Sequence, residues 1–510
     1  MSAESMPNLY EVIQSSLREH ARRPLMIAGE RRFTGADIDA RVAQYANGLI
    51  ALGLQPDDRL AVQVEKSFEN VLLYLASLRI GAVYLPLNTA YRPAEVAYFL
   101  SDATPRLFVC CPDSEAELRA VAQGAGVETV TSLGTSGDGM LPSVCAAQAE
   151  TGNIAPRSSE DLAALCYTSG TTGRSKGAMI THGNLLSNAQ TLVESWSFTA
   201  ADTLLHALPL YHVHGLFVAL HCALLSGART LLHARFEAKS VLQALTQSTV
   251  MMGVPTFYTR LLTEAALTRD TVRNVRLFVS GSAPLLVDTF TTFEIRTGQR
   301  ILERYGMTET GMITSNPLLG ERRAGSVGAP LPHVEVRVCD EDGNELARGQ
   351  VGNVEVRGPN VFKGYWQQPE KTRAAIRANG FFSTGDVGTI ELDGYLRLSG
   401  RAKDLIISGG LNVYPTEIEE AIDAIDGVIE SAVFGIPHPD FGEAVAAAVT
   451  LAPTATVTPA GIIETLRPRL AGFKTPKRVF VLDELPRNAM SKVQKTVLRE
   501  CYKHEFSVAH

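Results

Sequence analysis

Long uninterrupted apolar runs are absent from this chain of 510 residues. No stretch approaches the roughly 18 consecutive apolar residues that a membrane-spanning helix requires, so no membrane-embedded segment is expected. The first residues also lack a basic segment followed by an apolar core, the pattern that marks a secretory signal. We therefore expect a cytoplasmic protein with no membrane partner.

Cysteine patterns and excess positive charge are missing as well. The 7 cysteines include no Cys-x-x-Cys pair and no Cys/His array, so the sequence predicts neither a disulfide framework nor a zinc-type site. The net charge is -7 at pH 7, and an acidic balance argues against nucleic acid as a partner. A hydrophobic fraction of 45% with 20% charged residues remains, and that composition is typical of a folded globular protein.

The pattern of the first 400 residues predicts an α/β fold. Segments with helical periodicity, such as residues 35–45, alternate with short apolar runs, such as residues 59–63 and 106–110. Alternation of this kind is typical of sheets layered with helices. A chain of this length is expected to form about three units.

Short strands with turn signals replace this alternation at residues 325–400, which we interpret as a β-rich subdomain. The remainder is predicted to be a small, mobile α+β domain. The predicted domains are therefore 1–402, made of two α/β layers plus the β-rich subdomain, and 403–510. The elements expected in these parts are strands at 334–338, 352–357, 430–435 and 444–450 and helices at 415–424 and 461–470.

Residues 168–178 have the composition of a loop that wraps polyphosphate. They contain five hydroxyl side chains, three glycines and two cations, Arg174 and Lys176. Glycine lets the backbone turn its N–H groups inward as an anion-binding nest, while hydroxyls and cations contact phosphate oxygens. A flexible surface linker has a similar composition. The flanking residues 162–167 and 178–181 favour the first interpretation because both are predicted strands that would fix the ends of the loop.

Four further motifs follow this loop in order. They are Glu-Arg-Tyr-Gly-Met-Thr-Glu-Thr at 303–310, Phe-Ser-Thr-Gly-Asp at 382–386, Gly-Arg-Ala-Lys-Asp at 400–404 and Pro-Arg-Asn-Ala-Met-Ser-Lys at 486–492. Together with the loop, they resemble the adenylate-forming (AMP-binding) superfamily of acyl-CoA synthetases over nearly the whole chain. The resemblance implies a ligase that converts ATP and a carboxylic acid to an acyl adenylate and pyrophosphate, and then transfers the acyl group to coenzyme A.

The same resemblance implies the roles of individual residues toward ATP. Tyr305 is expected to stack on adenine, Thr308 to bond the α-phosphate, and Glu309 to help hold Mg²⁺. Taken alone, Glu309 could also be an ordinary solvated carboxylate. Asp386 and Arg401 are the expected ribose ligands. The full set of ATP-binding positions that carries over is Thr168, Ser169, Gly170, Thr171, Thr172, Gly173, Lys176, Ser282, Ala283, Pro284, Glu303, Arg304, Tyr305, Gly306, Thr308, Asp386, Arg401 and Lys492.

Lys492 is the expected catalytic cation, because an ammonium group can bridge the acid carboxylate and the α-phosphate. Family members have glycine before this lysine, and Ser491 stands there in this chain. Acylation of Lys492 by a lysine acyltransferase would remove its charge and is a further hypothesis. Lys403 falls at the family's hinge position. The residues expected to line the path of coenzyme A are Ser408, Gly409 and Gly410.

The acid-binding positions suggest a dicarboxylic acid. His212 is expected beside the reacting carboxylate, together with Met307, whereas His214 is interpreted as structural. Arg260 follows an apolar stretch, and a buried guanidinium there would need an anion. It could instead be an arginine on a helix surface.

Residues 208–216, 253–262, 279–285 and 358–366 resemble malonyl-CoA synthetases most closely. In that subfamily the counterparts of Arg260 and Ser282 bind the distal carboxylate of malonate. The resemblance therefore predicts malonate as the acid, with methylmalonate used less efficiently. It also predicts that Arg260→Met abolishes malonate use without affecting ATP binding.

Several other functions stay open at this stage. A ligase for an aromatic or medium-chain monocarboxylic acid is the main alternative, although an unpaired Arg260 in an apolar pocket would be costly. A peptide-synthetase adenylation module and a luciferase-type oxygenase share the motifs. A catalytically inactive nucleotide sensor is supported only by Ser491.

Overall fold

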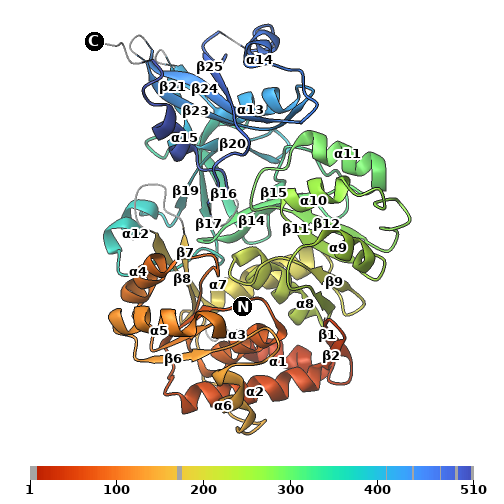
Figure 1. Ribbon diagram of the computed structural model, residues 1–510, viewed down its shortest axis with the longest axis vertical. Coiled ribbons are helices and arrows are strands. Elements are labelled where there is room, and N and C mark those ends of the chain that lie inside the picture. Colours follow the sequence, from red (N-terminus) through yellow and green to blue (C-terminus); the bar gives the residue numbers. More distant parts are fainter. Residues whose placement is uncertain are drawn as a thin grey trace. The chain divides into compact units, whose positions relative to one another are not determined.

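The computed structural model describes residues 8–168, 175–408, 411–438, 441–470, 472–488 and 492–506. The chain divides into two compact units. The first consists of Met1–Glu335 and Val356–Phe382, and the second of Val336–Glu355 and Ser383–His510. Figure 1 traces both units along the sequence.

The first unit contains a seven-stranded sheet that carries the predicted phosphate loop. Its strands are parallel except where β8 pairs with β7 and with β18. The loop joins β7 to β8, so its two ends are neighbours in the sheet. In spatial order the strands are β18 (Gly364–Tyr365), β8 (Lys176–Thr181), β7 (Leu162–Thr168), β4 (Val83–Pro86), β3 (Arg59–Gln63), β5 (Leu107–Cys110) and β6 (Thr129–Ser132).

A nine-stranded sheet forms the other half of this unit. Its central strands are parallel, and their side chains are buried apolar groups typical of a sheet covered on both faces. In spatial order the strands are β15 (Ala329–Pro330), β14 (Gly311–Ser315), β13 (Leu302–Met307), β12 (Leu277–Ser280), β11 (Val250–Gly253), β9 (Thr203–His206), β10 (Arg229–Leu232), β1 (Pro24–Ala28) and β2 (Arg31–Thr34).

Helices cover these sheets, and one of them is buried on all sides. Every residue of α3 (Phe68–Ile80) is buried, as expected for a helix that is apolar around its circumference. Its Tyr74 hydroxyl lies 2.8 Å from the His221 ring on α8, so α3 contacts a helix of the nine-stranded half. The other helices are α1 (Leu9–Glu19), α2 (Gly35–Ala51), α4 (Pro93–Ala103), α5 (Glu115–Gly124), α6 (Met140–Ala146), α7 (His182–Ser195), α8 (Leu220–Ser226), α9 (Ala238–Leu245), α10 (Pro255–Leu262), α11 (Val287–Thr297), α12 (Pro369–Ala375), the 3₁₀ turn η1 (Pro112–Ser114) and the π-helix η2 (His214–Ala219).

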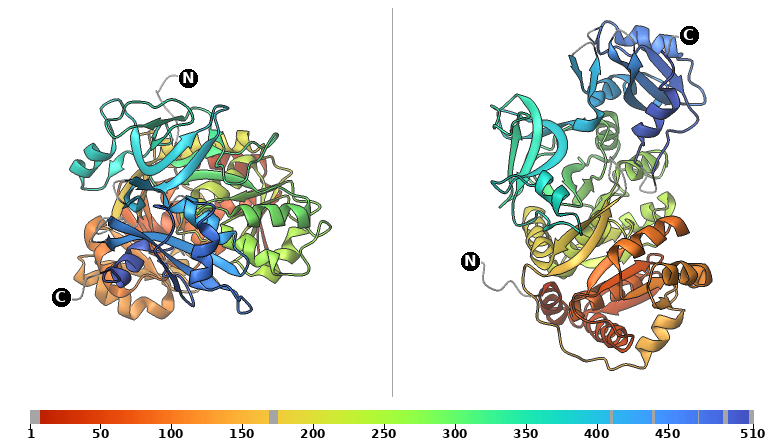
Figure 2. Two further views of the ribbon diagram at one scale, coloured as in Figure 1. Left: turned by 90° about the horizontal axis from the view of Figure 1, so that it is seen from above. Right: turned by 90° about the vertical axis from the view of Figure 1, so that its left-hand side faces the viewer.

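The second unit combines a four-stranded and a five-stranded sheet. The five-stranded sheet packs its apolar side chains against α13 and α14, and Figure 2 shows these strands and helices in blue. Its elements are β16 (Glu335–Cys339), β17 (Val351–Arg357), β19 (Phe382–Ile390) and β20 (Leu396–Arg401) in the first sheet, then η3 (Ala402–Asp404), β21 (Ile406–Ser408), β22 (Leu411–Val413), α13 (Pro415–Asp423), β23 (Val428–His438), β24 (Gly442–Leu451), α14 (Pro459–Leu466), β25 (Arg478–Val481) and α15 (Lys495–Tyr502).

The predicted α/β fold with a large amino-terminal and a small carboxy-terminal part is confirmed. The expected helix at 461–470 instead spans Pro459–Leu466, and it ends before Pro468, whose ring cannot continue a helix. The boundary at 402/403 stays a prediction. Across the described ranges, no helix is both long and apolar enough to cross a bilayer.

Candidate active site

The ends of the phosphate loop are held by the strands that flank it. Thr168 pairs with Lys176 in the β7–β8 ladder, and the Tyr98 hydroxyl of α4 donates to the Ser175 carbonyl at 2.6 Å. The Tyr167 hydroxyl donates to the Asp102 carboxylate. The loop ends are therefore fixed, as the sequence predicted. Its predicted phosphate ligands Ser169, Gly170, Thr171, Thr172 and Gly173, and also Arg174, lie outside the described residues.

A tight turn after β13 presents Thr308 and Glu309. The turn needs glycine at position 306, because a Cβ atom there would lie 2.2 Å from the Gly311 carbonyl oxygen. Tyr305 is buried directly before it, at 8% exposure. The motif recognised in the sequence is therefore a strand that ends in a compact turn.

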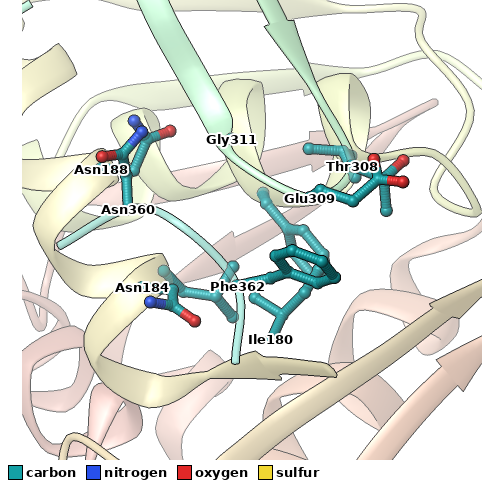
Figure 3. A pocket seen from close by; sticks show the side chains of 11 residues that line it. Ile180, Asn184, Asn188, Thr308, Glu309, Gly311, Asn360 and Phe362 are labelled. Carbon is teal, nitrogen blue, oxygen red and sulfur yellow. The ribbon is translucent and has the colours of Figure 1, made fainter. Parts of the chain in front are cut away.

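Thr308 and Glu309 border a small cavity. Figure 3 shows them on one side, with Asn184, Asn188 and Asn360 on the other. Its volume of about 20 Å³ is enough for a single water molecule. The cavity is too small for the adenine or the acid, so it belongs to the support of the turn.

The Glu309 carboxylate fits a magnesium ligand. It is a hard oxygen donor that is only 5% exposed, and the Tyr365 hydroxyl donates to its Oε1 at 3.1 Å. In the part of the chain that the structure describes, no three acidic, histidine or cysteine side chains gather as a complete metal site. Mg²⁺ is often held by one carboxylate together with phosphate oxygens and water, so a single donor suits an ion that arrives with the nucleotide.

Glu303 connects β13 to the loop after β12. Its Oε1 accepts a hydrogen bond from the Leu285 amide at 3.3 Å, and the side chain is 4% exposed. This contact holds the loop that contains Ser282, Ala283 and Pro284, the last two of which are exposed. Two segments that are distant in sequence are thus joined beside the predicted nucleotide positions.

Arg304 is the most unusual group of the site. Its guanidinium is 3% exposed and lies over Gly281, where an added Cβ would come within 2.4 Å of its Cζ. Its Nε and Nη2 find no hydrogen-bond partner among the described residues. Burial lowers the pKa of Arg304 to about 9, so it stays charged at neutral pH. A buried cation without an anion is strongly unfavourable, which points to a ligand that supplies one.

Ser282 and His214 lie beside this guanidinium. Ser282 has φ 75°, a left-handed conformation that costs a non-glycine residue energy and is often found at functional sites. Its Oγ lies 3.3 Å from His214 Nδ1, while His214 Nε2 has no partner within the described ranges. Burial and the nearby Arg304 charge hold the pKa of His214 well below its usual range. His214 is predicted to be structural, and this contact with Ser282 places it next to a residue that is predicted to bind the acid.

The segment that carries His212 and His214 is anchored by a buried lysine. Lys66 Nζ donates to His206 Nδ1 at 2.9 Å and to its carbonyl at 2.8 Å. With Nδ1 accepting, His206 Nε2 carries the proton and donates to the Gly215 carbonyl at 2.9 Å. The His212 Nδ1 in turn accepts from the His214 amide at 3.2 Å. The sequence analysis missed Lys66 and His206, since neither lies in a recognisable motif.

Arg260 is exposed on α10, and the sequence had suggested a buried guanidinium. The reason is its position in the last turn of the helix, where a long side chain reaches solvent. Met307 is partly buried at the end of β13. Arg304 is a buried cation of the described chain, whereas Arg260 is exposed, and the role predicted for Arg260 toward the acid stays a prediction.

The second unit brings Asp386 and Arg401 together. They face each other across β19 and β20, with Arg401 Nε 2.7 Å from Asp386 Oδ1. Lys403 lies in η3 and is exposed, and partial desolvation of its ammonium group lowers its pKa. Their predicted roles depend on a nucleotide and on motion, so they stay predictions.

Lys492 is exposed and is hydrogen-bonded to Asn488. The Asn488 side-chain oxygen accepts from the Lys492 backbone amide at 3.0 Å, and the Asn488 backbone amide donates to the Lys492 carbonyl at 2.9 Å. Ser408 is buried at the end of β21. Gly409, Gly410 and Ser491 lie outside the described residues.

Comparison with known proteins identifies the family to which the chain belongs. Residues 13–366 match the AMP-binding enzyme family, and residues 417–492 match the AMP-binding enzyme C-terminal domain. The chain is 35% identical to a mitochondrial malonate–CoA ligase of Bos taurus, over 88% of this chain and 82% of the relative. It is 34% identical to a feruloyl-CoA synthase of Amycolatopsis, over 92% of this chain and 94% of that protein. The crystal structure of ATP-bound MatB from Rhodopseudomonas palustris superposes with a TM-score of 0.95 at 50% identity, covering 99% of this chain and 100% of that one.

Proposed function

Because the chain belongs to the AMP-binding enzyme family, we propose that it ligates malonate to coenzyme A through a malonyl adenylate. In the first step, a malonate carboxylate oxygen attacks the α-phosphorus of ATP and pyrophosphate leaves. In the second, the coenzyme A thiol loses its proton to solvent, its sulfur attacks the acyl carbon, and AMP leaves.

The residues of the chain divide the work of the first step. Glu309 would hold Mg²⁺ together with phosphate oxygens, and that ion would supply charge neutralisation for the departing pyrophosphate. Thr308 bonds the α-phosphate, His212 lies against the reacting carboxylate, and Lys492 offsets the repulsion between the two anions. Asp386 and Arg401 bind the ribose in this proposal.

The second step is assigned to a different arrangement of the chain. Lys403 serves as the hinge about which residues 403–510 turn, and Ser408 with the glycines after it lines the path of coenzyme A. A location in the cytoplasm and acylation of Lys492 by a lysine acyltransferase belong to the same proposal.

The buried Arg304 carries the choice of a dicarboxylic acid. Its Nε and Nη2 have no hydrogen-bond partner among the described residues, and the distal carboxylate of a bound dicarboxylic acid would supply the anion that this guanidinium lacks. Ser282, a predicted ligand of that carboxylate, lies beside His214. The names of several relatives, malonate–CoA ligase among them, support malonate as this acid.

The principal alternative is a ligase for an aromatic or medium-chain monocarboxylic acid. The relative named feruloyl-CoA synthase is about as similar as the malonate–CoA ligase. An acid with an apolar tail would leave the Arg304 charge without an anion, at a cost of several kcal/mol. This difference favours malonate.

A panel of mono- and dicarboxylic acids tests the proposal. We expect malonyl-CoA, AMP and pyrophosphate from malonate, slower thioester formation from methylmalonate, and little from benzoate or octanoate. Thioester formation from benzoate or octanoate but not malonate would establish the alternative. Absence of pyrophosphate release with every acid would instead indicate a nucleotide sensor.

A further inference from the structure

A two-residue strand links the phosphate loop to the turn that carries Glu309. Strand β18 pairs with β8, placing Tyr365 opposite Ala178. The Trp366 amide donates to the Gly177 carbonyl at 2.8 Å, and the Lys363 amide to the Met179 carbonyl at 2.9 Å. The segment 363–366 is therefore joined to the strand that leaves the loop.

The same segment also holds Glu309. The Tyr365 hydroxyl donates to Glu309 Oε1 at 3.1 Å, and the Phe362 amide donates to the Glu309 carbonyl at 2.8 Å. The Tyr365 and Glu309 side chains are each less than a tenth exposed. A hydrogen bond to a buried carboxylate is charge-assisted, so it restricts the direction in which the second oxygen points.

The ring of Tyr365 contacts a second predicted ligand of ATP, Lys176. Lys176 Nζ lies over the ring face, 4.7 Å from its centroid, which is within the range of a cation–π interaction. The ring is itself fixed, because the Tyr365 amide donates to Thr372 Oγ1 at 2.9 Å and Phe362 packs edge-on at 4.9 Å. One side chain thus contacts the loop cation with its face and the carboxylate with its edge.

We propose that Tyr365 is a positioning residue that holds Lys176 and Glu309 at the spacing required to bind a nucleotide polyphosphate together with its magnesium ion. This inference rests on the proposed function. Partners that orient a metal-binding carboxylate usually contribute roughly 10- to 100-fold to metal affinity. A tyrosine that only fills the core would contribute to stability without changing the response to magnesium.

Calorimetric titration with ATP, at several Mg²⁺ concentrations and in EDTA, separates the two contacts. Tyr365→Phe keeps the ring under Lys176 and removes the hydrogen bond to Glu309. We expect it to weaken binding of Mg–ATP about tenfold and to leave binding of metal-free ATP unchanged. Tyr365→Leu removes both contacts, so metal-free ATP should also bind roughly threefold more weakly.

Tyr84→Phe is the matched control. The Tyr84 hydroxyl donates to Asn70 Oδ1 at 2.8 Å inside the core of the same unit. Its removal costs a comparable buried hydrogen bond, and the magnesium dependence of ATP binding should not change.

A double-mutant cycle keeps the inference testable if Tyr365→Phe lowers stability. In a Glu309→Gln background, Tyr365→Phe should have no further effect on the magnesium dependence, because its partner is already altered. Wild-type protein that binds Mg–ATP while Tyr365→Phe shows the same magnesium dependence would overturn the inference alone. Wild-type protein that binds no Mg–ATP would overturn both the inference and the proposed function.

Discussion

Two arginines near the neighbouring strands β12 and β13 of the nine-stranded sheet have opposite surroundings. Arg276 lies just before β12 and donates twice to the Asp202 carboxylate, at 2.8 Å each. It also donates to the carbonyls of Trp196 and Ser197, at 2.9 Å each. Arg304 lies in β13, with its guanidinium over Gly281 at the far end of β12, and its Nε and Nη2 have no partner among the described residues.

This contrast separates a charge that the protein itself neutralises from the charge that our proposal assigns to the substrate. Ligands in open α/β sheets bind beyond the carboxyl ends of the strands, where Arg304, Ser282 and His214 gather. Arg276 precedes the amino end of β12 and is satisfied by the protein itself. The protein therefore supplies a partner for every donor of Arg276, whereas Nε and Nη2 of Arg304 have none among the described residues.

The largest effect is expected from Arg304→Met. Loss of a buried, charge-assisted contact to the distal carboxylate should lower kcat/KM for malonate about 100- to 1,000-fold. The same change removes an unpaired buried cation, so the free energy of unfolding should stay equal or increase. Coupled assay of AMP release and thermal unfolding without malonate measure both quantities.

Arg260→Met serves as the comparison for Arg304→Met. The resemblance to malonyl-CoA synthetases predicts that this change abolishes malonate use. Because Arg260 is exposed, solvent screens its charge, and our proposal instead expects a smaller loss than in Arg304→Met. Mg–ATP affinity should be unchanged in Arg260→Met. Malonate turnover at the wild-type rate in Arg304→Met would assign the buried cation to another role.

Arg276→Met should show the reverse pattern, with a loss of stability and little loss of activity. It leaves the Asp202 carboxylate, which is 5% exposed, without its ion pair. Arg276 itself is 32% exposed, so we expect a decrease of about 2–3 kcal/mol in the free energy of unfolding, less than for a fully buried pair. Urea denaturation measures this decrease. Unchanged stability would show that the ion pair between Arg276 and Asp202 does not stabilise the fold.

Much of the fold was predictable because local patterns determine it. The strand at 59–63 and the helix beginning at Gly35 lie where the apolar periodicity placed them, the latter with Thr34 as its capping residue. The ends of the phosphate loop were also predictable, since both flanking strands are apolar runs.

The acid site was only partly predictable. His214 and Arg304 stand in recognisable motifs, but their lack of partners depends on which strands are neighbours, and no local pattern encodes that. The burial of Arg260 was not predictable, because an apolar stretch before it does not determine which face of α10 it occupies. Lys66 is 140 positions from its partner His206, so their contact has no signal in a single sequence.

A smaller effect is expected in the pH dependence of stability. His214 is held neutral because burial, the Arg304 charge and two neighbouring histidines keep its pKa well below 6.5. The unfolded chain binds a proton there as the pH falls through about 6.5, and the folded chain does not. Folding stability should therefore decrease with falling pH below 6.5, by about 1.4 kcal/mol per pH unit for this residue. His214→Gln should remove that contribution to the slope, measured by urea denaturation between pH 5 and 7.

His221→Gln distinguishes the site from the core. His221 is also buried, and burial lowers its pKa to about 3. Its replacement should therefore reduce the slope of folding stability against pH over the same range. Its ring contacts Tyr74 in the interior, away from Ser282 and Arg304. Both variants should therefore change the pH slope, while only His214→Gln should raise the KM for malonate. Equal KM values in the two variants would mean that His214 is one more structural histidine, and the donors left to the substrate would reduce to Arg304 and Ser282.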